Sequence, residues 1–147
     1  MKILKKPDTF LRENTSVVTF PLSEDNKQLI EVMKDVMYEN HGVGLAANQI
    51  GYGRRIFVMD VSKDQSKPEI FINPVIKKKA KEKLTQPEGC LSCPGELVEV
   101  KRPVYTTLSW FCPHGKEQYK TFYYMKSKVV QHEMDHLNGR LITDELE

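Results

Sequence analysis

The sequence predicts a single domain of the α+β class, spanning residues 1–147, in which helices pack on antiparallel β-sheet. The chain of 147 residues is long enough for one buried core and too short for two typical domains. An amphipathic pattern near the N-terminus predicts one helix, and a series of short β-like segments leads into a second helical pattern. Grouped strands with separate helices are typical of α+β domains.

The first predicted helix covers residues 24–38. Its apolar residues recur three and four positions apart, so they share one helical face: Leu29, Val32, Met33, Val36 and Met37. Ser23 can cap the N-terminus, where Glu24 and Asp25 complement the helix dipole. Residues 40–42, Asn-His-Gly, predict the end of the helix.

Five β-like segments follow, separated by proline and glycine: residues 55–60, 69–76, 97–101, 104–110 and 118–124. Residues 113–116 predict a hairpin turn between the last two strands. A second helix is predicted over residues 125–138 and ends at Gly139. The lysine-rich residues 77–83 predict an exposed strand edge or loop, because no aromatic residue is interleaved with the charges.

Composition excludes several classes of protein. Hydrophobic residues make up 39% and charged residues 29%, a balance typical of soluble globular chains, and no apolar run is long enough to span a membrane. The N-terminus lacks a leader pattern, which predicts a cytoplasmic protein. A net charge of +2 is too small to indicate nucleic-acid binding. Three cysteines argue against a disulfide framework and leave metal ligation or a reactive thiol open.

The pattern with the clearest chemistry lies on the second predicted helix. His132 and His136 are four residues apart, so both imidazoles can reach one metal ion, with Glu133 beside its open side as a general base. The alternative is a pair of surface histidines beside an ordinary glutamate. Val129 and Val130 indicate a buried helix, which favours the metal site because buried charged groups need partners.

Two histidines do not complete a catalytic metal site, which normally has three protein ligands and one open position. Candidate third ligands are Cys90, Cys93, Cys112, His41, His114 and several carboxylates. The glycines and prolines of residues 87–95 predict irregular backbone near two of these thiols. Cys90 and Cys93 could also form a closed structural zinc site with the two histidines, but that site would have no use for Glu133.

The glycine-rich residues 42–51 are by themselves only a weak signal and could form a flexible turn. Three segments together, residues 42–49, 88–92 and 131–139, resemble the peptide deformylase family almost residue for residue and in the same order. The resemblance implies antiparallel β-sheets packed around a central metal-binding helix. It also implies removal of the formyl group from the N-terminal formylmethionine of nascent polypeptides, with release of formate.

Carried over position by position, the resemblance makes Cys90, His132 and His136 the ligands of one divalent metal ion. The family's usual metal is ferrous iron, with zinc, nickel or cobalt as other occupants. Such an ion makes hydroxide available from bound water near neutral pH, and Glu133 would act as general base and then acid.

The same resemblance implies oxyanion stabilisation by the Gln49 amide and the Leu91 backbone N–H. Val43, Gly44 and Gly89 would bind the extended peptide as an added strand. Met125 and Val129, together with Leu91, would form an apolar pocket for the methionine side chain.

The sequence also departs from the common family pattern. His41 replaces an acidic residue, and Leu97 replaces an arginine near the substrate cleft, although Arg102 keeps a second arginine. The chain resembles short viral forms without the usual C-terminal helix, which leaves at most weak ribosome association to be expected. We expect a monomer in the cytoplasm of a bacterium or of an infected host cell. A metallopeptidase with the same histidine-glutamate motif is the alternative enzyme.

Overall fold

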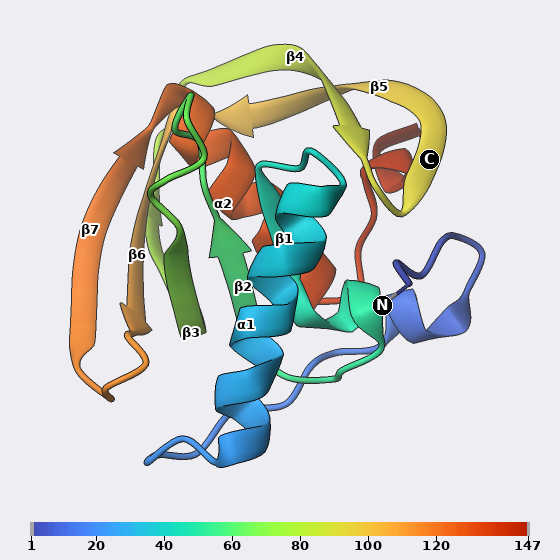
Figure 1. Cartoon of the computed structure of the whole chain (residues 1–147). Coiled ribbons are helices and arrows are strands. Elements are labelled where there is room, and N and C mark those ends of the chain that lie inside the picture. The colour runs from blue at the N-terminus through green and yellow to red at the C-terminus, as the bar shows by residue number, and fades with distance from the viewer. Residues whose placement is uncertain (1, 147) are drawn as a thin grey trace.

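The computed structural model describes the backbone of residues 2–146 and the side chains of residues 2–144. A five-stranded antiparallel sheet has the order β1 (Gly44–Ala46), β2 (Ile56–Met59), β3 (Glu69–Lys79), β6 (Tyr105–Phe111) and β7 (Glu117–Tyr123). A separate hairpin consists of β4 (Lys83–Cys90) and β5 (Cys93–Pro103). Helix α2 (Tyr124–Leu137) lies between the large sheet and this hairpin, and helix α1 (Glu24–Glu39) lies beside β1 and β2 (Figure 1). The predicted α+β class is confirmed.

The side chains on both faces of strand β2 belong to the hydrophobic core. Ile56 and Val58 belong to the cluster that packs against α1, whereas Phe57 and Met59 belong to the cluster that packs against α2. All four side chains are buried, which explains a continuous apolar run in place of an alternating one. The two helices therefore cover opposite faces of the sheet. Helix α2 is held between the sheet and the β4–β5 hairpin.

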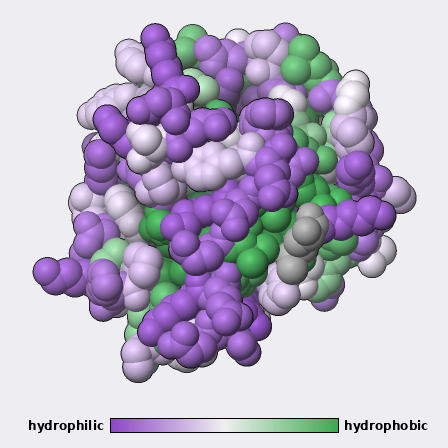
Figure 2. Space-filling model, viewed as in Figure 1, coloured by the Kyte–Doolittle hydropathy of each residue, from purple (hydrophilic) through white to green (hydrophobic). Residues whose placement is uncertain are grey.

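Both predicted helices are confirmed within two residues at each end. In α1, the Ser23 hydroxyl accepts a hydrogen bond of 3.1 Å from the Asn26 backbone N–H, as expected of a cap. The apolar face of α1 is buried, and its outer face is covered by hydrophilic side chains (Figure 2). Helix α2 ends at Leu137, and its C-cap residue Asn138 is followed by Gly139 with a φ of 76°.

The structure corrects the backbone predicted for one segment and excludes an alternative for another. Residues 87–95 were expected to be irregular, yet they form the paired ends of β4 and β5, with one register shift between Glu88 and Cys90. Residues 42–51 are not a flexible turn, because they contain β1 and a buried 3₁₀ helix, Ala47–Ile50. Pairing within the β4–β5 hairpin orders the first stretch, and pairing with β2 together with burial orders the second, although the composition of both favours a loop.

The remaining surface features agree with the sequence analysis. Residues 113–116 connect β6 to β7 as a hairpin turn, in which Gly115 has a φ of 80°. Lysines 77–79 lie at the exposed end of β3, where the strand has passed the end of β2 and pairs with β6 alone. Within residues 2–146, no helix is long and apolar enough to cross a membrane.

Gly139 is expected to be essential for stability because α2 must turn there against the N-terminal segment. A Cβ on Gly139 would lie 2.3 Å from the Arg12 carbonyl oxygen, whereas a Cβ on Gly51, with a φ of 91°, would meet no atom within 4 Å. Alanine at either position has the backbone cost of the left-handed conformation, about 1–2 kcal/mol. Gly139→Ala should lose a further 1–3 kcal/mol or so through overpacking, measured by urea unfolding. Equal losses in the two variants would contradict the clash.

Candidate metal centre

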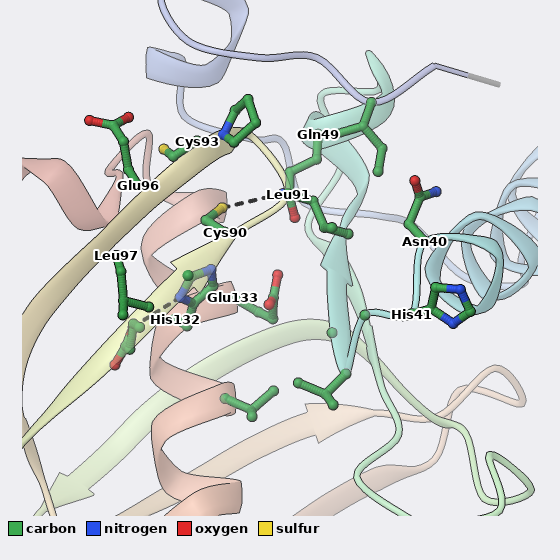
Figure 3. A pocket seen from close by; sticks show the side chains of 18 of the residues that line it. Asn40, His41, Gln49, Cys90, Leu91, Cys93, Glu96, Leu97, His132 and Glu133 are labelled. Atoms are coloured by element: carbon green, nitrogen blue, oxygen red, sulfur yellow. Dashed lines mark hydrogen bonds and ion pairs between the residues drawn. The ribbon is translucent and has the colours of Figure 1, made fainter.

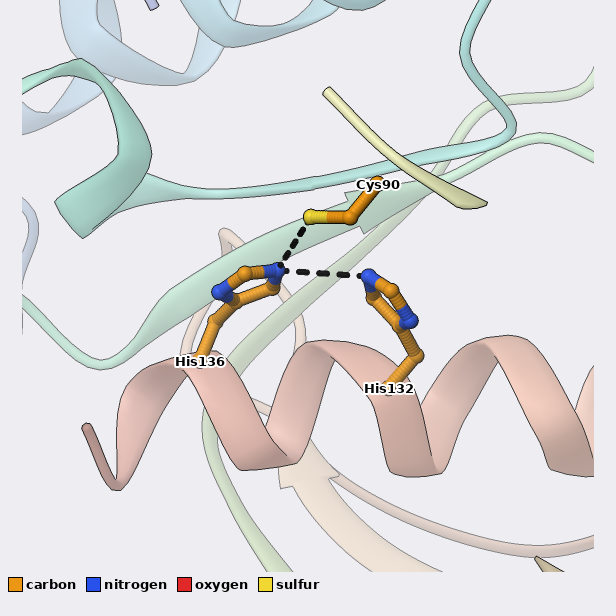
Figure 4. A group of neighbouring side chains, drawn as sticks. All are labelled: Cys90, His132 and His136. Carbon is orange, nitrogen blue, oxygen red and sulfur yellow. Dashed lines mark hydrogen bonds between the residues drawn. The ribbon is translucent and has the colours of Figure 1, made fainter. Parts of the chain in front are cut away.

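Three side chains that can bind a metal meet at the middle of the fold. His132 and His136 project from one face of α2, and their Nε2 atoms are 3.2 Å apart. The Sγ atom of Cys90, at the end of β4, is 3.2 Å from Nε2 of His136. The ligand atoms all lie within 4.8 Å of one another (Figure 4). The chain thus brings together two residues from a helix and one from a strand more than forty positions earlier.

The chemistry of these donors fits a bound cation. A sulfur and two imidazole nitrogens point at one another, and a cation can accept a lone pair from each of them. His136 is 1% exposed, and burial lowers its pKa well below the ordinary value, so the ring is held in the neutral form that ligates metals. Among the described side chains, the cluster includes one thiol and leaves out Cys93, which is fully buried in the hydrophobic cluster against which Cys90 packs.

Glu88 and Arg102 orient His132 from the Nδ1 side of its ring, away from the other two ligand atoms. The Glu88 carboxylate is 3.0 Å from Nδ1 of His132, so Nδ1–H can donate to it and leave the Nε2 lone pair facing Cys90 and His136. Arg102 donates two hydrogen bonds to Glu88, of 2.6 and 3.0 Å, and a third of 2.9 Å to Asp135. Burial acts to raise the pKa of Glu88, but the hydrogen bonds from His132 and Arg102 outweigh it and lower that pKa to about 2.

Glu133 lies beside the cluster with an unused acceptor. Its side chain is buried, and its Oε1 atom has no hydrogen-bond partner within the described chain. Burial raises the pKa of Glu133 to about 7. The carboxylate points between His132 and strand β1 (Figure 3), where a Cβ on Gly44 would lie only 2.6 Å from Oε2. Gly44 therefore allows the β1 backbone to approach this carboxylate.

The Gln49 amide is oriented by two hydrogen bonds. Its Oε1 accepts a hydrogen bond of 3.0 Å from the Ala46 backbone N–H, which assigns the nitrogen to the side facing the hairpin. Nε2 donates to the Ser92 hydroxyl at 3.0 Å and lies 3.8 Å from the Cys90 sulfur. Leu91 follows Cys90 in the turn between β4 and β5. Both residues thus lie next to the ligand cluster.

A pocket of about 950 Å³ opens over this cluster, within the size range of small-ligand sites. Every residue predicted to bind substrate lines it: Val43, Gly44, Gly89, Leu91, Met125 and Val129. Val129 is 5% exposed at the pocket floor, whereas Met125 is 51% and Leu97 is 74% exposed. His41 also lines the pocket but lies away from Cys90 and His132 (Figure 3), so it is not in the ligand cluster.

Known proteins that resemble this chain in sequence and in structure identify its family. The family profile for polypeptide deformylase matches residues 1–147. The chain belongs to the polypeptide deformylase family. It is 40% identical to a peptide deformylase of Pelagibacter ubique over 98% of this chain and 84% of the relative. It is 41% identical to that of Pseudothermotoga lettingae over 97% of this chain and 81% of the relative.

Solved peptide deformylase structures superpose closely on the chain. A peptide deformylase from Legionella pneumophila has a TM-score of 0.94 at 37% identity and covers 99% of this chain and 85% of its own. A probable peptide deformylase from Synechococcus phage S-SSM7 has a TM-score of 0.91 at 34% identity, with 98% of each chain covered. Polypeptide deformylases are metal-dependent, and the Cys90, His132 and His136 cluster offers this chain a matching site.

The residues that support the ligand cluster of this deformylase were not predicted from its sequence. Glu88 begins one of the three segments that resemble the family, but no role was predicted for it. Arg102 was noted only as a second arginine near the substrate cleft. In the structure, Arg102 is 8% exposed and points inward to Glu88 and Asp135. Asn48 also went unnoticed, although its Nδ2 donates a hydrogen bond of 2.6 Å to the His136 carbonyl. These contacts join segments distant in sequence, so no local spacing indicates them.

Replacing Glu88 should weaken metal binding without removing a ligand. In Glu88→Gln the His132 ring keeps a neutral neighbour but loses the carboxylate that orients it and increases its basicity. We expect metal affinity to fall roughly 10–100-fold, measured by competition with a chelating dye. Glu99→Gln is the matched control, because Glu99 is an exposed residue of the same hairpin. Unchanged affinity in Glu88→Gln would show that Glu88 serves only to hold Arg102.

Proposed function

We propose that Cys90, His132 and His136 hold one divalent metal ion and that Glu133 transfers the protons of formamide hydrolysis. Family membership establishes the overall reaction, in which the formyl group is removed from the N-terminus of a polypeptide and formate is released. One observation carries the assignment of roles. Glu133 is buried beside the three-ligand cluster, and one of its carboxylate oxygens has no hydrogen-bond partner among the residues that the structure describes. A glutamate that served only the structure would be paired at such a depth.

The metal supplies chemistry that no side chain of the pocket has. A bound divalent ion lowers the pKa of a coordinated water and polarises a carbonyl oxygen. A thiolate with two imidazoles suits several borderline metals. We infer ferrous iron as the occupant, with zinc, nickel and cobalt as substitutes, because the sequence resembles a family that usually uses iron. Metal analysis of protein purified without oxygen identifies the occupant.

Glu133 is placed to move a proton from the attacking water to the departing amine. Its free Oε1 can accept the water's proton as the oxygen attacks the formyl carbon. The same carboxylic acid can then donate that proton to the amine nitrogen as the carbon–nitrogen bond breaks. Burial favours the step in which Glu133 holds the proton, since it raises the pKa of this carboxyl group above the ordinary value.

Gln49 and Leu91 would stabilise the oxygen of the formyl group. That oxygen gains negative charge when the carbon becomes tetrahedral, so N–H donors aimed at it stabilise the transition state more than the substrate. The hydrogen bonds of Gln49 to Ala46 and Ser92 hold its amide in place before substrate arrives. Loss of one such donor typically costs about 3–4 kcal/mol in the barrier.

The peptide would bind in extended form between β1 and the end of β4. Strand β1 is an edge of the five-stranded sheet, so the backbone at Val43 and Gly44 can pair with an added strand, and Gly89 faces it from the hairpin. The apolar side chains of Leu91, Met125 and Val129 suit a methionine side chain. We therefore propose N-formylmethionyl nascent chains as substrates, met in the cytoplasm by a monomer with at most weak ribosome association.

The decisive assay compares three peptides that differ only at the N-terminus. A formyl-Met peptide should release formate, whereas the acetylated and the free-amine peptides should remain intact. Rejection of the acetyl group is expected because its extra methyl group would enter the space beside Glu133, where β1 already approaches closely. Cleavage of an internal peptide bond without formate release would instead indicate a metallopeptidase, and no hydrolysis of any peptide would contradict both enzymes.

A further inference from the structure

Cys93 is a second thiol beside the ligand Cys90, and the proposed reaction does not use it. The two cysteines are separated by Leu91 and Ser92, which form the turn between β4 and β5. Cys90 and Cys93 are register partners across this hairpin. Both side chains also pack in the same buried cluster, with Cys93 inside it and Cys90 against it. The pair therefore lies at the turn end of the hairpin, and this hairpin forms one wall of the pocket.

The backbone geometry of this pair matches that of a disulfide. Residues directly opposite in an antiparallel pair have Cα atoms about 4.5–5.5 Å apart. Disulfides span Cα separations of about 4.4–6.8 Å, so the sulfurs can bond without moving the strands apart. The Cys-x-x-Cys spacing is also that of redox-active thiol pairs in other proteins. The third cysteine, Cys112, lies at the β6–β7 turn and is not part of this pair.

The two thiols differ in their access to solvent. Cys90 is partly exposed in the pocket, whereas Cys93 is 0% exposed and packs with Leu11, Val98 and Val100 in the core. An oxidant that enters the pocket therefore meets Cys90 first. Cys93 is positioned to react with the Cys90 sulfur rather than with the oxidant.

We propose that Cys90 and Cys93 are a modification site that forms a reversible disulfide with hydrogen peroxide when no metal occupies the cluster. The Cys90 sulfur attacks one peroxide oxygen, so an S–O bond forms, the O–O bond breaks and one water leaves. The Cys93 sulfur then attacks the Cys90 sulfur, so the S–S bond forms, the S–O bond breaks and a second water leaves. Two thiols lose two electrons, and one peroxide becomes two waters.

The disulfide has two consequences for the chain. It removes the Cys90 thiolate from the ligand cluster, so the oxidised protein cannot hold the metal through three ligands; this consequence rests on the proposed function. It also protects Cys90 from irreversible oxidation, because a sulfenic acid without a neighbouring thiol proceeds to the sulfinic and sulfonic acids. Reduction by a thiol reagent then restores the site.

Mass spectrometry tests the disulfide without any activity measurement. Trypsin cuts after Lys83 and Lys101, so Cys90 and Cys93 lie on peptide 84–101 and Cys112 lies on another. After peroxide treatment of metal-free protein, the wild-type peptide 84–101 should be lighter by two hydrogen atoms and should regain them with dithiothreitol. The Cys93→Ala peptide should instead gain oxygen atoms that dithiothreitol does not remove. Metal-loaded wild type should show much slower loss of the two hydrogens.

The matched control is Cys112→Ala, in which peptide 84–101 should behave as in wild type. Added oxygen atoms on the wild-type peptide, or no change in its mass when Cys112 is oxidised, would overturn the proposal. Metal content, measured after dithiothreitol treatment, should recover in wild type and not in Cys93→Ala. The ligand role of Cys90 is judged separately, from the metal content of reduced Cys90→Ala, so failure of one assignment is distinguishable from failure of the other.

Discussion

Glu133→Ala is expected to reduce turnover of a formyl-Met peptide by roughly 10²–10⁴-fold or more, which is the usual contribution of a positioned acid or base. Metal content should remain near that of wild type, because the ligand cluster consists of Cys90, His132 and His136 and does not include Glu133. The loss should appear in kcat, since the proton is transferred in the transition state rather than during binding. Steady-state kinetics with metal analysis of the same preparation measures both quantities.

Stability provides an independent readout of this role. Glu133 is 3% exposed with an unpaired oxygen, so it contributes a buried acid that the fold does not satisfy. Glu133→Gln keeps the volume and removes the charge, and it should therefore melt at the wild-type temperature or above while remaining inactive. Inactivity combined with a large fall in melting temperature would indicate a structural glutamate. Substantial activity in either variant would overturn the assignment of Glu133 as the proton carrier.

Elements whose burial follows a regular pattern could be predicted from sequence. The first helix has apolar residues at helical spacing, and its buried residues Leu29, Ile30, Met33, Val36 and Met37 reproduce that face almost completely. Strand β4 was missed because Glu88 alone of its eight residues is buried, so no alternation marks it. It forms because β5 supplies partners for all of its residues except Gly89, and intrinsic propensity does not contain that cross-strand pairing.

The site, like the fold, has residues that the sequence pattern predicts and residues that it does not. Two ligands four residues apart on a helix follow from spacing alone, whereas the third ligand depends on where a distant hairpin packs. The residues left that choice open among several donors, and only the resemblance favoured Cys90. The series of ion pairs from His132 through Glu88 and Arg102 to Asp135 could not be predicted from the sequence. Charged residues are common, and these pairs join different elements of the fold. Ion pairs become specific only once the fold has brought them together.

The two cysteines of the hairpin should respond very differently to alanine. Cys90→Ala removes a proposed ligand and should lose most bound metal and essentially all formate release. Cys93→Ala should keep both under reducing conditions, because Cys93 is outside the ligand cluster and packs as a small apolar side chain. Metal analysis and the formyl-peptide assay on freshly reduced protein compare the two variants.

Thermal unfolding adds the measurement that separates this open site from a closed zinc module. If all four Cys and His side chains held a structural ion, metal binding would be coupled to folding, and either substitution would lower the melting temperature and the metal content together. With three ligands, Cys90→Ala should melt like metal-free wild type, whereas Cys93→Ala should lose only the packing of one sulfur in its core cluster. Similar metal loss from both variants would overturn the three-ligand cluster, and with it the open coordination position on which hydrolysis by this chain depends.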